Sequence, residues 1–256
     1  METILNSQSH SKLELHQSSI NDYIYCPKLY YFRYVAQVPY QVSEAMYIGS
    51  CVHATLAEAA KQKMSPKEAR EYLVFEVETG ESWKRGEDKP LPELPHKEAE
   101  LETAAYLVEK YVSLHSLDYI AVEQEIKKEV GDVLLVGTVD RVDSDGNIID
   151  YKVSNRPRRQ YKVDVQSLVY ASLTGSFAFQ YHVLVKSKEP FIQIVRVNPT
   201  PNQVKWFEEN FLPELAASIN NGVFYPNFTS WICSPKFCTF YNMCVKENMA
   251  CRIQTN

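Results

Sequence analysis

The chain has 256 residues, of which 45% are apolar, and it carries a formal net charge of −5. This length is enough for one full core or two small ones, and the composition is typical of a globular protein. No apolar run reaches the roughly 18 residues of a membrane-spanning helix, and the polar residues 1–17 lack the apolar stretch of a secretory signal. We therefore expect a flexible polar tail at residues 1–17 and a cytoplasmic protein that does not contact a membrane.

The first half of the chain is predicted to be mostly helical. Ser19-Ile20-Asn21-Asp22 resembles a capping box, so a helix should start near Ile20 and run towards Val35, with a disturbance at Pro27. A second helix is predicted after Gly49. Residues 65–117 predict further helices around a proline-rich, acidic break at residues 89–96, and we interpret this segment as a helical, acidic insertion.

The second half alternates strands and helices. Strands are predicted at residues 120–130, 133–142, 148–153, 179–186 and 191–197. Helices are predicted at residues 162–173 and from Pro201 onward, where Thr200 is the cap. This order indicates a mixed α/β sandwich around one sheet, formed by residues 18–222. Residues 223–256 are rich in Pro, Asn and Cys and show no periodicity, so another constraint must order them.

A short hairpin carries the most informative polar residues. The turn at residues 143–147 contains Asp145-Gly146 between apolar-rich runs, which is a strong hairpin signal. If Asp143 faces Asn147 across this turn, Asp140 faces Asp150, with Cβ atoms roughly 5 Å apart. Two carboxylates at that distance oppose folding unless a positive charge lies between them. A divalent cation such as Mg²⁺, which takes oxygen ligands, is the natural occupant.

Basic residues follow this hairpin without an intervening acid, in contrast to the acidic segment before it. They are Lys152, Arg156, Arg158, Arg159 and Lys162. A local basic patch beside a carboxylate site suits an anionic substrate. A solvated, arginine-rich loop explains the same segment equally well.

Several motifs occur in an order that resembles a known family. By itself, an Asp followed ten residues later by Asp-Tyr-Lys could be no more than solvent-facing strand residues. The motifs that accompany it are Gly49 with His53, Gly137 with Asp140, Asp150 with Lys152, and Gln166 with Tyr170. Together they resemble the RecB-type branch of the PD-(D/E)XK nuclease superfamily, with CRISPR-associated iron-sulfur exonucleases and related phage nucleases as the nearest type. The resemblance spans residues 18–244 and implies a restriction-endonuclease-like mixed central sheet flanked by helices.

The resemblance also implies roles for these residues. Asp140 and Asp150 would be metal ligands, assisted by the backbone carbonyl of Tyr151 and by His53. Lys152 would orient the attacking water or stabilise charge. Gln166 and Tyr170 would support the site and contact DNA, and the basic residues 156, 158, 159 and 162 would bind the substrate. Without the resemblance, a histidine beside apolar helix residues is more often packed or exposed than a ligand. An imidazole ligand would favour Mn²⁺ as well as Mg²⁺.

The cysteines form a second group. The four that match the family's [4Fe-4S] site are Cys26, Cys233, Cys238 and Cys244. The resemblance implies that such a cluster fastens the C-terminal segment to the N-terminal helix. Zinc remains the alternative, although the paired CxxC motifs of structural zinc sites do not occur here. Cys51 is expected in the core, and Cys251 is an alternate ligand at most.

Aromatic residues surround these cysteines. They are Tyr23, Tyr30, Tyr31, Phe32, Phe237, Phe240 and Tyr241. They either pack around the cluster or stack on bases of single-stranded DNA.

The sequence and its resemblance together predict a Mg²⁺- or Mn²⁺-dependent DNA exonuclease that acts on single strands or DNA ends. Its setting would be prokaryotic or phage-encoded, with protein partners in a replication, repair or spacer-acquisition complex. Two alternatives remain open: a non-catalytic DNA-binding or assembly subunit, and a zinc-stabilised interaction protein.

Overall fold

The computed structural model describes residues 12–84, 90–159 and 162–246. Its strands are β1 (Leu13–His16), β2 (Tyr119–Val130), β3 (Val133–Asp143), β4 (Ile148–Ser154), β5 (Phe179–Val185) and β6 (Phe191–Val197). Its α-helices are α1 (Gln17–Tyr25), α2 (Pro27–Tyr30), α3 (Glu44–Gln62), α4 (Pro66–Thr79), α5 (Glu81–Lys84), α6 (Lys97–Leu114), α7 (Val165–Thr174), α8 (Pro201–Trp206), α9 (Leu212–Asn220) and α10 (Tyr241–Lys246). Two π-helical turns, η1 (Tyr31–Val35) and η2 (Phe207–Phe211), continue α2 and α8.

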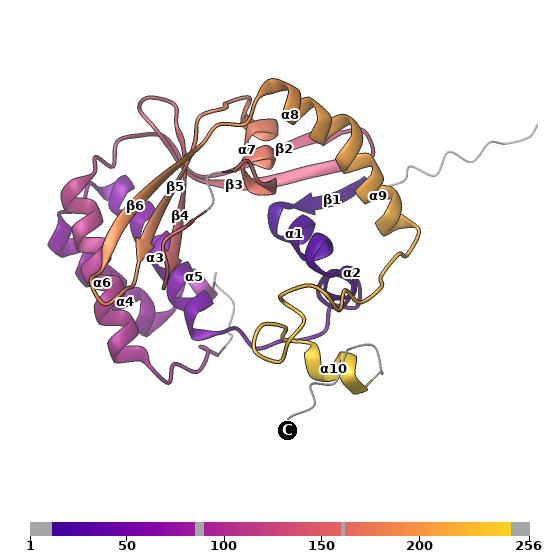
Figure 1. Cartoon of the computed structure of the whole chain (residues 1–256). Coiled ribbons are helices and arrows are strands. Elements are labelled where there is room, and N and C mark those ends of the chain that lie inside the picture. The colour runs from indigo at the N-terminus through magenta and orange to yellow at the C-terminus, as the bar shows by residue number, and fades with distance from the viewer. Residues whose placement is uncertain (1–11, 85–89, 160–161, 247–256) are drawn as a thin grey trace, which may run out of the picture.

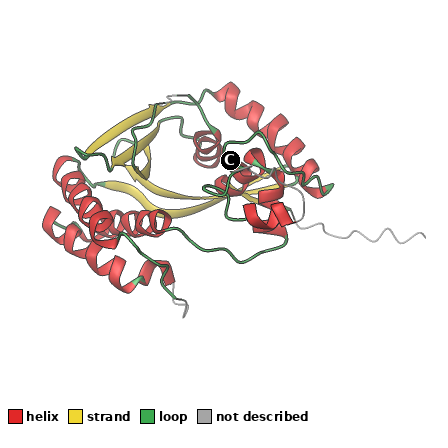
Figure 2. Ribbon diagram, turned by 60° about the horizontal axis from the view of Figure 1, so that its bottom comes forward, coloured by secondary structure: helices red, strands yellow, loops and turns green. Residues whose placement is uncertain are grey.

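The strands form one mixed sheet in the order β1-β3-β4-β5-β6, and β2 pairs with the other edge of β3. Pairing is parallel between β1 and β3 and between β4 and β5, and antiparallel elsewhere. Helices cover both faces of the sheet, as Figures 1 and 2 show. The predicted mixed α/β sheet flanked by helices is therefore confirmed.

Each face of the sheet has its own apolar core. One buried cluster joins α1, α7 and α9 to β1, β3, β5 and β6. The other joins α3, α4 and α6 to Ile149, Tyr151 and Leu184. Helices α4 and α6 of residues 65–117 therefore pack with α3 in the helical layer of one face. No helix in the described residues is long and apolar enough to span a bilayer.

Several element boundaries differ from those predicted. Helix α1 starts at Gln17 rather than near Ile20, because His16 and Ser19 form its capping box, and α7 starts at Val165 rather than at residue 162, because Asp164 caps it. Residues 13–16 form β1 rather than a flexible tail, because they pair in parallel with residues 133–136 of β3. The alternation of Leu13 and Leu15 was the only local signal. Helix α3 starts at Glu44, before Gly49, because the Ser43 side chain accepts a hydrogen bond from Met46 N at 3.3 Å and caps the helix. Residues 1–11, also predicted to be a flexible tail, lie outside the described residues.

The predicted turn is present. Asp143 N donates to Asn147 O at 3.0 Å, and Arg141 pairs with Ile149. Asp140 and Asp150 are the next residues beyond this last pair, and the register of the pairs is the one that the sequence predicted.

One edge of β3 is shared by two strands and is open between them. β1 pairs with residues 133–136, and β4 pairs with Arg141 and Val142. Among the described strands, none pairs with residues 137–140 on this edge. Helix α7 lies against the gap, where Tyr170 Oη donates to Thr138 O at 2.6 Å. A Cβ added to Gly137 would lie 2.7 Å from Leu173 Cδ1, so a larger residue at this position would force the Leu173 side chain of α7 to move.

Candidate active site

Asp140 lies at the end of this gap and separates the two strands of the hairpin. Its Oδ2 accepts a hydrogen bond from Tyr151 N at 2.8 Å. This side-chain oxygen is the acceptor that a backbone carbonyl would be in a regular strand pair. The same oxygen lies 3.1 Å from His53 Nδ1 of α3. The Asp140 side chain therefore joins three elements, and β4 continues along β5 rather than along β3.

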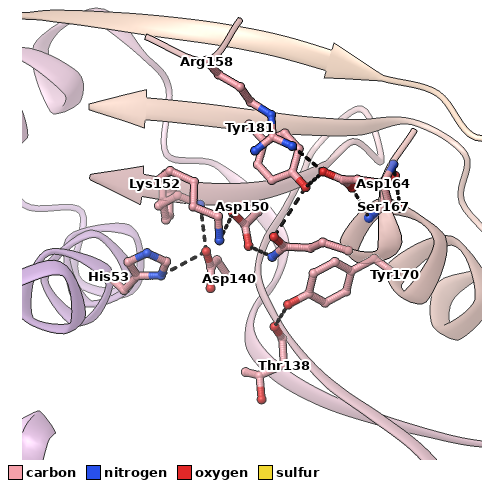
Figure 3. Close-up of polar contacts among 12 residues, drawn as sticks. His53, Thr138, Asp140, Asp150, Lys152, Arg158, Asp164, Ser167, Tyr170 and Tyr181 are labelled. Atoms are coloured by element: carbon pink, nitrogen blue, oxygen red, sulfur yellow. Dashed lines mark hydrogen bonds and ion pairs between the residues drawn. The ribbon is translucent and has the colours of Figure 1, made fainter. Parts of the chain in front are cut away.

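Asp150 is held by groups from its own strand and from α7. Lys152 Nζ lies 2.8 Å from Asp150 Oδ2, and Gln166 Nε2 donates to Asp150 Oδ1. Figure 3 shows Lys152, Asp150 and Asp140 directed toward one another, with His53 beside Asp140. Two carboxylates, an imidazole and an ammonium group therefore converge at one place.

A further set of side chains supports Gln166. Tyr181 Oη of β5 lies 3.4 Å from Gln166 Oε1 and donates to Asp164 Oδ2 at 2.7 Å. Asp164 caps α7, since its Oδ1 accepts from Ser167 N at 2.9 Å. The guanidinium of Arg158 pairs with Asp164 and lies 3.9 Å from the centre of the Tyr181 ring. This arrangement fixes the start of α7 and hence the position of Gln166.

Burial and opposing charges set the protonation of the site. Burial lowers the pKa of His53, but the Asp140 carboxylate outweighs it, and the pKa is raised overall. Burial raises the pKa of Asp140, but His53 and other groups outweigh it, and the pKa is lowered. For Asp150, burial prevails over the attraction of Lys152, and with the repulsion of Asp140 it raises the pKa to about 6. The pKa of Lys152 rises because Asp150 outweighs burial. Asp140 is thus the more readily ionised carboxyl, and the site would gain from additional positive charge.

The site opens into a cavity of about 860 Å³. His53, Asp140 and Lys152 line it, together with Thr138 of the strand gap. Asp150 is only 3% exposed. The cavity is large enough for part of an extended ligand beside the converging polar groups.

Comparison with known proteins identifies the family. Residues 14–245 match the PD-(D/E)XK nuclease superfamily. The chain belongs to the PD-(D/E)XK nuclease superfamily. Among solved structures, it is similar to a protein from Eubacterium rectale described as a "Putative exonuclease", with a TM-score of 0.60 and 16% identity over 100% of this chain and 96% of the other. A weaker likeness, with a TM-score of 0.36 and 13% identity, covers 80% of this chain and 86% of SSO0001. No curated protein matches the chain.

Membership of this superfamily supports nuclease activity, and nucleases of this superfamily generally use divalent metals. Within the described residues, no three His, Cys, Asp or Glu side chains form a ready-made metal-binding group. Instead, His53 pairs with Asp140, and Lys152 pairs with Asp150. The donor types nevertheless fit Mg²⁺ or Mn²⁺, and Asp150 Oδ2, which is buried, has the Lys152 ammonium group 2.8 Å away. His53, Asp140, Asp150 and the Tyr151 carbonyl are the groups that would hold such an ion.

The predicted cluster cysteines come near one another, although in the part of the chain that the structure describes no three of them form a metal-binding group. All four line one small apolar cavity of about 20 Å³. Cys26 Sγ accepts a hydrogen bond from Asn227 N at 3.4 Å, and burial raises the pKa of Cys238. Cys51, a residue of α3, lies instead in the core between α3, α4 and α6, as expected. Cys251 lies outside the described residues.

The four predicted substrate-binding residues differ in their surroundings. Arg158 is engaged with Asp164 and Tyr181, as described above. Arg156, Arg159 and Lys162 are exposed beyond the end of β4.

Sequence reasoning missed three residues of the site. Asp164 and Tyr181 support Gln166, and only the Asp164 cap had a local sequence signal. Glu123 lies on β2 between the pairs that Val122 and Gln124 form with β3. It lines the active-site cavity and has a left-handed φ of 49°, which nothing in the sequence indicates.

Proposed function

We propose that this protein is a Mg²⁺- or Mn²⁺-dependent deoxyribonuclease that hydrolyses phosphodiester bonds in single-stranded DNA or at DNA ends. The observation that carries the proposal is the convergence of His53, Asp140, Asp150 and Lys152 beside one open cavity. Membership of the nuclease superfamily supports it.

The roles of the chain's own residues follow from their contacts. A bound divalent ion supplies charge neutralisation at the phosphate and promotes ionisation of water. Asp140 and Asp150 would hold it, and His53 would exchange its pairing with Asp140 for a place at the ion. Lys152, whose ammonium group reaches the cavity, stabilises negative charge on the phosphate as water adds to phosphorus and one P–O bond breaks. Gln166 keeps Asp150 in position, and Tyr170 keeps the strand gap at its present width.

The test is hydrolysis of labelled DNA by the purified protein with Mg²⁺, with Mn²⁺ and with EDTA. We expect metal-dependent hydrolysis that Lys152→Met reduces by at least about a hundredfold, as for the loss of one charge-stabilising group. Lys205→Met is the matched control, because Lys205 is an exposed lysine of α8. Equal activity of the wild type and Lys152→Met would overturn the assignment of Lys152. A wild type without metal-dependent hydrolysis would favour a non-catalytic DNA-binding subunit.

Exonuclease action is tested with substrates that differ only in having ends. We expect linear single-stranded DNA to be degraded to short products while the same strand in circular form stays intact. Nicking of the circular strand at a comparable rate would instead identify an endonuclease. Exposed Arg156, Arg159 and Lys162 are the groups that we propose contact the phosphates, because they follow β4 directly after Lys152.

We further propose that Cys26, Cys233, Cys238 and Cys244 bind a [4Fe-4S] cluster. The support is that these four thiols, from segments about 200 residues apart, line one apolar cavity. Iron, sulfide and zinc analysis of anaerobically purified protein, with visible absorption, is the test. We expect iron, sulfide and a brown colour that bleaches on reduction. Cys238→Ala should lose them, whereas Cys51→Ala should keep them, because Cys51 lies in a different core cluster. Stoichiometric zinc without iron would overturn the proposal.

A further inference from the structure

Residues 223–246 are called the cysteine tail here. Three exposed aromatic rings contact one another in a row on the surface of this tail and of the end of α1. Tyr25 of α1 meets Trp231 edge to face, with ring centres 5.7 Å apart, and Trp231 meets Phe237 in the same way at 5.3 Å. These three side chains, defined here as the aromatic chain, are 36%, 61% and 52% exposed. Rings that contact one another and still face solvent contribute little to a core.

Hydrogen bonds to neighbouring residues hold the aromatic chain in place. Asn227 Nδ2 donates to Tyr25 O at 3.1 Å, which ties the tail to the end of α1. Phe237 N donates to Ser234 O at 3.2 Å in the loop between two of the cysteines. The backbone that carries Tyr25 and Phe237 is therefore held by hydrogen bonds within the tail and between the tail and α1.

The surroundings of the aromatic chain are basic, although the whole chain has a charge of −5. Residues 223–246 contain Lys236 and Lys246 and no acidic residue. Residues 17–43 contain a single acid, Asp22, which is buried and lies 2.5 Å from Arg33. Lys236 Nζ lies 5.4 Å from the centre of the Phe237 ring. This surface therefore attracts anions.

We propose that the aromatic chain binds single-stranded DNA by stacking on its bases, with Lys236 contacting the phosphates. Exposed rings combined with basic groups are the chemistry that binds unpaired nucleotides, because every base has a face that can stack. A duplex buries these faces in its own stack, so the same rings gain little from it. The inference rests on the proposed function for DNA as the substrate, and it adds a binding site on the cysteine tail, outside the active-site cavity.

Five other aromatic residues near the cysteines have another use. Tyr23, Tyr30, Phe32, Phe240 and Tyr241 are all buried. They pack α1, α2 and η1 against the tail, for example through the Phe32 and Phe240 rings, whose centres are 5.3 Å apart. Of the aromatic residues that the sequence singled out, only Phe237 belongs to the aromatic chain.

The test is binding of a fluorescein-labelled oligothymidine of about 15 nucleotides to the full-length protein in EDTA, measured by anisotropy. We expect Trp231→Ala and Phe237→Ala each to raise the Kd at least about fivefold, as for the loss of one stacked base, and to leave the Kd for a blunt hairpin duplex unchanged. Trp206→Ala is the matched control, because Trp206 is 56% exposed on α8, away from the tail. Both tested side chains are exposed, so their removal should leave the fold intact, which circular dichroism verifies.

Two results would overturn the inference. The first is that Trp231→Ala and Phe237→Ala bind oligothymidine with the same Kd as Trp206→Ala. The second is that these two variants lose affinity for the single strand and for the duplex to the same extent. Unchanged DNA binding would assign the rings to a protein partner instead. Because the binding assay contains EDTA, it is independent of hydrolysis. A wild type that binds oligothymidine through Trp231 and cleaves no DNA would end the proposed function and keep the inference. If the wild type cleaves DNA and Trp231→Ala binds oligothymidine as tightly as the wild type, the proposed function is kept and the inference is ended.

Discussion

Asp150 is the residue at which activity and stability should conflict most. Its carboxyl is 3% exposed, and burial raises its pKa to about 6 from the usual 3.8, despite the attraction of Lys152. Because the folded protein holds this proton more tightly than the unfolded chain, stability falls as the pH rises through this interval. At about 1.4 kcal/mol for each tenfold change in proton affinity, the ionised Asp150 costs the folded state about 3 kcal/mol above pH 6.

Asparagine has nearly the same shape as aspartate and no charge to desolvate. We therefore expect Asp150→Asn to raise the free energy of unfolding of the metal-free protein by about 1–3 kcal/mol at pH 8. The lower end of this range allows for the lost ion pair with Lys152, which lies 2.8 Å away. The gain should shrink toward zero as the pH is lowered below 6. The same substitution should remove hydrolysis, because a carboxylate is replaced by a weaker metal ligand.

The assay is urea unfolding in EDTA at several pH values between about 5 and 8, compared between the wild type and Asp150→Asn. Asp145→Asn is the control, because Asp145 is an exposed carboxylate in the turn of the same hairpin. Adding Mn²⁺ should then stabilise the wild type and leave Asp150→Asn unchanged. A variant that is no more stable than the wild type at pH 8, or whose gain does not depend on pH, would refute the electrostatic reasoning.

Three further predictions concern the support of the site. Gly137→Ala should lower the free energy of unfolding by about 1–2 kcal/mol, because the new Cβ would lie 2.7 Å from Leu173. Gly49→Ala should raise it by about 0.5–1 kcal/mol, because no atom lies within 4 Å of the new Cβ and alanine favours the helix. Urea unfolding of the two variants measures the sign of each change. Tyr170→Phe should cost about 1–2 kcal/mol and slow hydrolysis without changing the Kd for oligothymidine, since it leaves a strand carbonyl without its hydrogen bond; equal kcat values would contradict this. Burial lowers the pKa of His182 to about 3. Below pH 6.5, His182 therefore binds a proton in the unfolded chain but not in the folded protein. The free energy of unfolding should fall by about 2 kcal/mol between pH 6.5 and 5 for this reason. His182→Gln should remove this part of the pH dependence, and an unchanged slope would show that His182 does not cause it.

The hairpin shows why part of the site could be predicted. The Asp-Gly turn fixes the register of its two arms locally, and the register alone places Asp140 opposite Asp150. Lys152 then shares a face with Asp150 because strand side chains repeat every two residues. These relations involve residues close in the chain, so the sequence contains them in full.

The groups that complete the site come from distant elements. Glu123 lines the cavity only because β2 pairs with β3 on both sides of Asp140, and Tyr181 reaches Gln166 only because β5 pairs with β4. The Asp140 hydrogen bond to Tyr151 N depends on two strands separating at one particular position. Spacing along the chain contains none of this information.

The sequence by itself determined most of the helices, the strands with alternating patterns, the hairpin register and the order of the family's motifs. Only the tertiary structure decided that residues 13–16 form a strand, that β1 and β4 share one edge of β3, and which tail aromatics remain exposed. The physical reason is the separation along the chain of the residues that interact. Turns, caps and periodicities are set by neighbours within a few residues, whereas a four-residue strand or an exposed ring depends on packing between segments far apart in the chain.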